Sequence, residues 1–181
     1  MPADIRLAVA TNAETLARIR QPLANRDIYA EHVPVSERTL PLDSSLGTFD
    51  VGFVFPSRLM EGGVADAMLD VPWVNTREDI LRSRNKAGAL ARLSAADVPT
   101  PKSVLVSNPV SDDDLEAVWE QFDAPVVVKP NSTTRGTGIA KVSDFDSLLG
   151  VTDYLDLVHD YRATGDRSYL IQEYLPDARD Y

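Results

Sequence analysis

Residues 126–142 constrain the fold more than any other stretch of the chain. Three consecutive valines between two prolines predict a short buried strand that ends at Lys129. A loop of hydroxylated residues and two glycines follows, and the apolar run at 139–142 predicts a second strand. The loop between them suits an anionic ligand, because glycine lets the backbone approach closely and free N–H groups point outwards.

The charged residues of this segment fit the same kind of ligand. Lys129 supplies a point charge, and Arg135 supplies a fork that bridges two oxygens. The segment matches neither G-x-x-x-x-G-K-[ST] nor G-x-G-x-x-G, since the lysine precedes the glycines. An exposed turn with solvated charges is the alternative interpretation, and the loop taken alone favours it.

Composition indicates a folded protein without disulfides. The chain has 181 residues, 44% of them hydrophobic, which suffices for one domain or two small ones. It contains no cysteine, so disulfides and thiolate metal sites are excluded. No apolar run approaches the roughly 18 residues of a membrane span, and the N-terminus lacks a basic region followed by an apolar one. We therefore expect a cytoplasmic protein without a membrane partner.

The charge balance is strongly acidic. Asp and Glu number 28 against 18 Lys and Arg, for a net charge of -10, and 20 of the acids are Asp whereas only 4 of the bases are Lys. Such a charge argues against nucleic acid as a partner. The surplus of Asp over Lys is typical of the acidic proteome of a halophilic archaeon, where salt screens a dense negative surface. An ordinary acidic protein is the alternative.

The first 75 residues alternate predicted strands and helices. Apolar runs predict strands at 5–10, 28–33, 50–55 and 71–75, and helical spacing predicts helices at 13–25 and 57–69. This alternation predicts an open, Rossmann-like parallel sheet. No glycine fingerprint follows the first strand, so a docking and framework role is favoured for this domain.

The remaining sequence predicts a small α+β subdomain with an antiparallel sheet. One regular helix is expected at 76–96, capped by Thr76 and carrying a basic cluster that includes Lys86. Further strands and helices are expected in the order 102–107 (strand), 111–122 (helix), the segment described above, 144–158 (helix) and 169–175 (strand).

Three separated segments carry a family resemblance. S-R-N-K at 83–86, with A-L-A-R-L at 89–93 and V-P-T-P at 98–101, resembles the entry signature of ATP-grasp ligases. Residues 125–130 with 134–139 are similar to their phosphate-covering loop, and 170–175 with 178–180 resemble their adenine hinge. Order and spacing best match the RimK-like branch, carboxylate–amine ligases that attach glutamate or related amino acids. The match runs from about Val71 to Tyr181, and the earlier residues fit the family's leading domain in outline.

The resemblance implies a role for particular residues. Lys86 and Lys129 would hold ATP phosphates, and the loop at 131–138 would cover them as a lid. The hinge would bind adenine through its backbone and through Gln172 or Glu173. The other implied nucleotide-binding residues are Thr134, Arg135, Gly136, Gly138, Tyr174, Leu175 and Asp180. The alternatives are a solvated helix charge for Lys86, core packing for the hinge strand and a surface ion pair of Arg179 with Asp180.

The resemblance also implies what lies outside this chain. The family's metal ligands, an Asp or Glu and a Glu-x-Asn pair, follow the hinge, as does its substrate-positioning arginine, and this chain stops at Tyr181. We therefore expect a leading pre-ATP-grasp domain with its connecting helix at 1–96, a first ATP-grasp subdomain with the hinge at 97–181, and no second half. No catalytic or metal-binding residue is expected within the chain, since the acidic residues at 144–156 have the spacing of a solvated helix face.

The expected function follows from the resemblance. It is a Mg²⁺-dependent ligase that uses ATP to form an amide through an acylphosphate, present here as a piece that is inactive by itself. A non-catalytic nucleotide-binding or partner-docking protein is the alternative, and a framework protein without a ligand is a third. The carboxylate and amine substrates and any homo-oligomer are left open.

Overall fold

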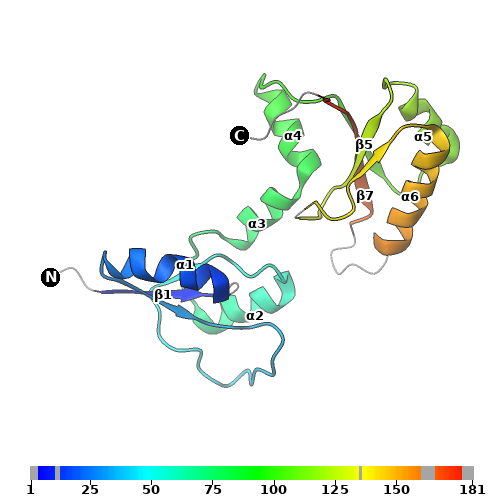
Figure 1. Ribbon diagram of the computed structural model, residues 1–181. Coiled ribbons are helices and arrows are strands. Elements are labelled where there is room, and N and C mark those ends of the chain that lie inside the picture. Colours follow the sequence, from blue (N-terminus) through cyan, green and yellow to red (C-terminus); the bar gives the residue numbers. More distant parts are fainter. Residues whose placement is uncertain (1–3, 11–12, 135, 160–165, 177–181) are drawn as a thin grey trace. The chain divides into compact units, whose positions relative to one another are not determined.

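Two sheets of different type organise the chain, a parallel one in its first part and an antiparallel one in its second (Figure 1). The computed structural model describes residues 4–10, 13–134, 136–159 and 166–176. The chain divides into two compact units, Met1–Leu81 and Arg82–Tyr181. The division at 96/97 expected from the sequence stays a prediction.

The first unit is a parallel sheet with a helix against each face. Its strand order is β2-β1-β3, with β1 at Ile5–Val9, β2 at Ile28–His32 and β3 at Val51–Phe53. Successive side chains of a strand point to opposite faces. Leu7 and Val9 therefore pack with Leu16 of α1 (Ala13–Ala24), and Ala8 packs with Ala65 of α2 (Leu59–Leu69). The parallel sheet predicted from the alternating pattern is confirmed.

The strand expected at 71–75 is reduced to a single bridge between Gly52 and Trp73. The indole lies against the backbone of β3, where a Cβ on Gly52 would come within 2.5 Å of Trp73 Cε3. Backbone hydrogen bonds join Gly52 N to the Pro72 carbonyl, Val74 N to the Gly52 carbonyl and Phe55 N to the Asn75 carbonyl, and the chain then enters the next helix.

The single helix expected at 76–96 is two helices, α3 (Arg77–Arg84) and α4 (Lys86–Ala95). The break is at Asn85, whose side chain accepts a hydrogen bond from the backbone N–H of Gly88 at 2.8 Å. Asparagine is among the preferred N-cap residues, because its side-chain oxygen satisfies a backbone donor that the helix leaves unpaired. Asn85 thus starts a second helix where the apolar pattern alone predicted continuity.

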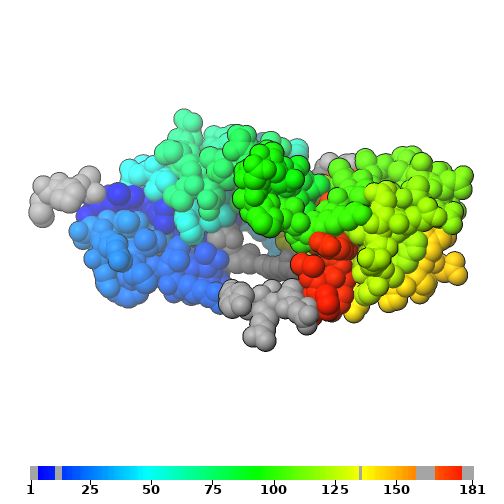
Figure 2. Space-filling model, turned by 90° about the horizontal axis from the view of Figure 1, so that it is seen from above, coloured from blue at the N-terminus to red at the C-terminus, as the bar shows by residue number. Residues whose placement is uncertain are grey.

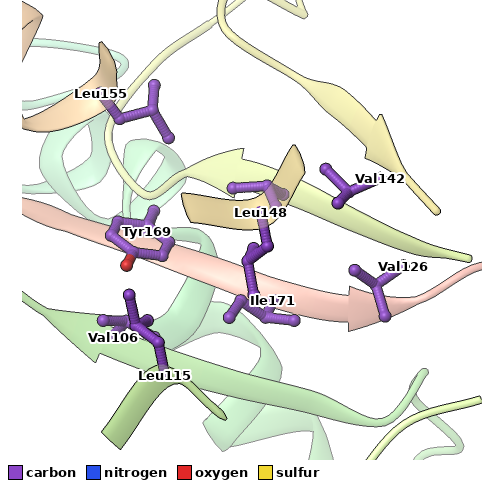
Figure 3. Packing of buried hydrophobic residues seen from close by; sticks show 9 residues of the cluster. Val106, Leu115, Val126, Val142, Leu148, Leu155, Tyr169 and Ile171 are labelled. Carbon is purple, nitrogen blue, oxygen red and sulfur yellow. The ribbon is translucent and has the colours of Figure 1, made fainter. Parts of the chain in front are cut away.

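The second unit is an antiparallel sheet in the order β4-β7-β5-β6, and two helices cover one of its faces (Figure 1). Its core includes Val126 and Val128 of β5, Tyr169 and Ile171 of β7, and Leu148 of α6 (Figure 3). The antiparallel subdomain predicted from the sequence is confirmed. The remaining elements are β4 (Ser103–Ser107), α5 (Asp112–Trp119), β5 (Val126–Pro130), β6 (Ala140–Val142), α6 (Phe145–His159) and β7 (Ser168–Glu173).

Candidate functional site

Strand register places three polar side chains together on the face of the second sheet opposite α5 and α6. Ser103 of β4 lies directly opposite Gln172 of β7, and Lys129 of β5 lies opposite Leu170. Lys129 and Gln172 are therefore diagonal neighbours on one face, a separation that long side chains span. The lysine at the end of β5 and the glutamine of the expected hinge meet on this surface.

A directed chain of hydrogen bonds joins these groups. Lys129 Nζ donates to Gln172 Oε1 at 2.5 Å, Gln172 Nε2 donates to Ser103 Oγ at 2.7 Å, and Ser103 Oγ donates to the Pro101 carbonyl at 2.9 Å. Gln172 is only 6% exposed, and both ends of its amide are used. An ammonium has three N–H donors, so Lys129 is held in place by one and keeps the others for a ligand.

Lys86, the first residue of α4, fastens the loop that follows β5. Its Nζ donates to the carbonyl oxygens of Pro130 at 2.9 Å, of Asn131 at 3.2 Å and of Thr133. Three carbonyl dipoles converge on one ammonium, and such charge-assisted bonds are stronger than neutral ones. Lys86 is therefore a structural clamp on the start of the loop as well as a cation beside it.

Asn131 is the junction between α4, β7 and this loop. Its side-chain oxygen accepts from the backbone N–H of Ala87 at 2.9 Å, and its Nδ2 donates to Ser168 Oγ at 3.0 Å. Asn131 and Ser168 are both 9% exposed. A buried polar group costs free energy unless it is bonded, so these satisfied contacts fix the loop start firmly to the helix and the sheet.

A cavity of 340 Å³ lies in front of the two lysines, and its lining includes Lys86, Lys129, Gln172 and Leu90. A larger cavity of 710 Å³ adjoins it through the shared residues Leu90, Pro101 and Leu170, and extends along α4 and β4. In Figure 2 the red end of β7 lies at the surface of the second unit, beside green segments of the chain. The two adjoining cavities thus offer one site with the two lysines at one end and a mixed polar and apolar lining at the other.

The glycine-bearing loop after Asn131 forms tight turns. Gly136 and Gly138 have φ of 71° and 76°, which a residue with a Cβ adopts only with strain. Backbone bonds from Thr137 N to Thr134 O at 3.2 Å and from Ile139 N to Gly136 O at 3.3 Å close these turns. Thr134, at the start of these turns, is exposed.

No family model matches the chain. Its sequence is similar to the glutamate–LysW ligase ArgX of Sulfolobus acidocaldarius, at 22% identity over 160 residues, which cover 87% of this chain and 55% of that protein. Its structure is similar to a RimK domain ATP-grasp protein from Sphaerobacter thermophilus, with a TM-score of 0.65 and 23% identity over 94% of this chain and 64% of that one. The chain has an ATP-grasp fold.

A second structural comparison extends this ATP-grasp likeness beyond the RimK-like branch. The biotin carboxylase domain of Hydrogenobacter thermophilus 2-oxoglutarate carboxylase, solved with MgADP, ADP and bicarbonate, matches with a TM-score of 0.73 and 13% identity over 97% of this chain and 45% of that one. The resemblance to RimK-like ATP-grasp proteins that the three sequence segments indicated is confirmed. The chain spans about half the length of the curated relative that it matches.

Within this ATP-grasp fold, the residues expected to bind nucleotide fall into two groups. Lys86, Lys129 and Gln172 converge on the 340 Å³ cavity. Glu173 points elsewhere: its Oε1 accepts from the backbone N–H of Lys102 at 2.7 Å, and the Tyr174 ring lies 3.8 Å from the ammonium of Lys141. The residues lying outside that cavity's lining are Thr134, Gly136, Gly138, Glu173, Tyr174 and Leu175, while Arg135 and Asp180 lie outside the described residues.

Two residues at this candidate site escaped the sequence analysis. Ser103 is an ordinary strand serine by sequence, and only the pairing of β4 with β7 shows that it orients Gln172. Asn131 falls within the expected lid, yet it is a buried anchor. The asparagine directly after the strand-ending Lys129-Pro130 was the available signal, because asparagine commonly bonds nearby backbone groups at such positions.

Among the described residues, no group of three or more His, Cys, Asp or Glu side chains has an arrangement that holds a metal ion. The same part of the chain contains no helix that is long and apolar enough to cross a membrane.

Proposed function

We propose that this chain supplies the nucleotide-binding part of an ATP-dependent carboxylate–amine ligase. The observation that carries the proposal is the convergence of Lys86, from a helix, and Lys129, from a strand, on one cavity beside a glycine-bearing loop. Two cations from different elements suit a polyphosphate, whose charge a single side chain does not balance. The name of the curated relative, a glutamate ligase, supports the same class of reaction.

The proposed reaction has two steps. A carboxylate oxygen of the first substrate attacks the γ-phosphorus of ATP, the bond to the β–γ bridging oxygen breaks, and ADP leaves. The nitrogen of the amine substrate then attacks the acyl carbon of the acylphosphate, inorganic phosphate leaves with its bonding electrons, and the amine loses a proton to form the amide. The loop after Asn131 protects the acylphosphate from water by lying over the phosphates.

The chain's own residues contribute binding and charge. Lys129, oriented by Gln172 and Ser103, directs its ammonium at the transferring phosphate and stabilises the negative charge that develops there. Lys86 holds the loop start through three carbonyls. A phosphate contact by Lys86 requires exchange of one of those bonds, so nucleotide binding and loop position are coupled through this side chain. Magnesium would neutralise phosphate charge in this reaction, and among the described residues no group of three or more His, Cys, Asp or Glu side chains is arranged to hold it.

A nucleotide-binding module without catalysis is the second candidate. The two functions share the cavity and the lysines and differ in whether ATP is consumed. The test is to incubate the protein with ATP, a carboxylate and an amine and to measure the products. A ligase releases ADP and phosphate when all three are present, whereas a binding module releases neither. Release of AMP and pyrophosphate would reject the mechanism, because it would mean adenylation of the carboxylate.

Binding by these 181 residues is tested directly by NMR titration with ADP and ATP. We expect weak binding, at about millimolar nucleotide or about -4 kcal/mol, because only one side of the nucleotide is contacted by this unit. Lys129→Ala should abolish the shifts around the cavity. Arg92→Ala is the matched control, since it removes the same charge from an exposed position on α4 outside both cavity linings. Equal titrations of the two variants would reject the proposed site.

A further inference from the structure

A small cavity on the helix-covered side of the second sheet is separate from the nucleotide site. Its volume is 90 Å³, and it lies among α5, α6 and β7. Three carboxylates line it, and no Lys or Arg is among its lining residues. The polar groups around it are Asn108, Asp112, Thr152, Asp153, Asp156 and Tyr169.

Tyr169 presents an unpartnered hydroxyl to this cavity. The residue is only 1% exposed, and among the described residues its OH makes no hydrogen bond of ordinary geometry. Figure 3 shows its ring next to Val106 and Leu115, and Leu115 also lines the cavity. Burial raises the pKa of Tyr169 well above its ordinary value, an interaction with the Thr152 side chain opposes this, and the negative charges of Asp156 and Asp153 raise the pKa further. The phenol is therefore neutral, and its oxygen is available to a cation.

Asp156 adds an unpartnered oxygen to the same cavity. Its Oδ1 is buried without a hydrogen-bond partner. Asp156 lies in the last turn of α6, where the negative end of the helix dipole already disfavours an acidic side chain. A buried carboxylate oxygen in such surroundings needs a positive or donating neighbour, and none of the cavity's lining residues is a cation.

We propose that this cavity binds one monovalent alkali cation, with the Tyr169 hydroxyl and the Asp156 carboxylate as protein ligands. Oxygen ligands are those that hard cations prefer. A divalent ion is disfavoured, because no group of three acidic side chains among the described residues has metal-binding geometry. The volume of 90 Å³ exceeds the about 30 Å³ that one water takes in the liquid, so an ion fits with water completing its shell.

Thermal unfolding of the chain tests the site at constant ionic strength, with KCl, NaCl or choline chloride as the salt. Choline screens charge equally but is too large for the cavity. An alkali cation bound only to the folded state should raise the melting temperature by about 3 °C at tenfold excess over its dissociation constant, and the gain should keep rising with the logarithm of the cation concentration. Equal melting temperatures in the alkali and choline salts would overturn the proposal and would mean that water fills the cavity.

Two variants test whether the alkali-specific rise in melting temperature comes from this cavity. Tyr169→Phe and Asp156→Asn should each remove most of the difference between alkali and choline salts. Asp146→Asn is the matched control, because it removes one charge from α6 away from the cavity and should keep the full difference. Thallium-205 NMR of the unchanged chain, with Tl⁺ replacing K⁺, gives a readout that does not depend on variant stability. If no signal from bound thallium is seen, or if potassium does not displace it, the proposal is overturned.

Discussion

Lys129 and Gln172 face each other diagonally across β5 and β7, with 2.5 Å between Nζ and Oε1. The contact fixes the direction of the ammonium, because the far end of the same amide is bonded to Ser103. A neutral amide also leaves the lysine charge uncompensated, whereas a carboxylate in that place would pair with it. The geometry thus supplies a positioned, unneutralised cation at the edge of the 340 Å³ cavity.

Gln172→Leu should weaken nucleotide binding about tenfold, or about 1.4 kcal/mol, because Lys129 loses the acceptor that orients it. Ser103→Ala should have a smaller effect in the same direction, since it frees only the far end of the amide. Gln172→Glu should hold Lys129 in place but neutralise it, so binding should again fall while folding is kept. NMR titration with ADP measures all three, and wild-type affinity in Gln172→Leu would show that the contact has no positioning role.

Lys86→Met should destabilise the second unit by about 2 kcal/mol. The variant keeps the apolar stem but leaves the carbonyls of Pro130, Asn131 and Thr133 without their shared donor. Arg92→Ala is again the comparison, since Arg92 is exposed on the same helix and should change stability little. Urea unfolding followed by circular dichroism measures both, and equal midpoints would mean that Lys86 is a solvated helix charge.

Lys129 and Lys86 differ in how much of their structural role the sequence could predict. Lys129 was located correctly because the valine run defines the strand and the strand fixes which face each side chain occupies. The partners of Lys86 are backbone carbonyls 44 to 47 residues away along the chain, and their positions depend on the loop conformation rather than on residue types. No local pattern reveals such a contact.

The helix boundaries also could not be predicted fully from the sequence. The apolar spacing at 76–96 predicted one helix, and the break at Asn85 was missed because an asparagine inside a helical pattern becomes a cap only when the chain direction has to change. The two sheet types were predicted correctly, since alternation of strands with helices and clustering of strands are properties of the whole segment. The roles of individual hinge residues depend on side-chain direction, and for these the resemblance supplied only candidates.

Gly62 and Gly63 offer a matched pair on α2. A Cβ on Gly62 would lie 2.4 Å from Phe55 Cε1, whereas a Cβ on Gly63 would have nothing within 4 Å. Gly62→Ala should therefore destabilise the first unit by about 1–3 kcal/mol through overpacking. Gly63→Ala should be neutral or stabilising by up to about 1 kcal/mol, because alanine favours the helix. Urea unfolding of the two variants checks this, and the same sign for both would contradict the packing of Phe55 on α2.

Acid should weaken the start of α5. Hydrogen bonds from the side chain and then the backbone N–H of Ser111 hold the pKa of Asp114 below its ordinary value of 3.8. Because the folded-state pKa is depressed, the stabilisation is present above the unfolded-state pKa and is lost as pH falls through the folded-state value, below about 3.8. Asp114→Asn should flatten the dependence of melting temperature on pH in that window. Asp112→Asn, in the same helical turn, is the control, and equal slopes for the two would reject the capping contribution.

Salt should stabilise the whole chain by screening. The net charge is -10, and the Debye length falls from about 10 Å at 0.1 M salt to about 3 Å at 1 M, so repulsion among the acidic residues is progressively removed. The opposing loss of surface ion pairs is small, because pairs such as Arg18–Glu14, with both side chains more than three-quarters exposed, contribute little. Melting temperature should therefore rise steadily in choline chloride up to multimolar concentration, with alkali-specific stabilisation added on top. A constant melting temperature in choline chloride would reject salt adaptation of the surface, and the alkali site would then be judged only on the difference in melting temperature between alkali and choline salts.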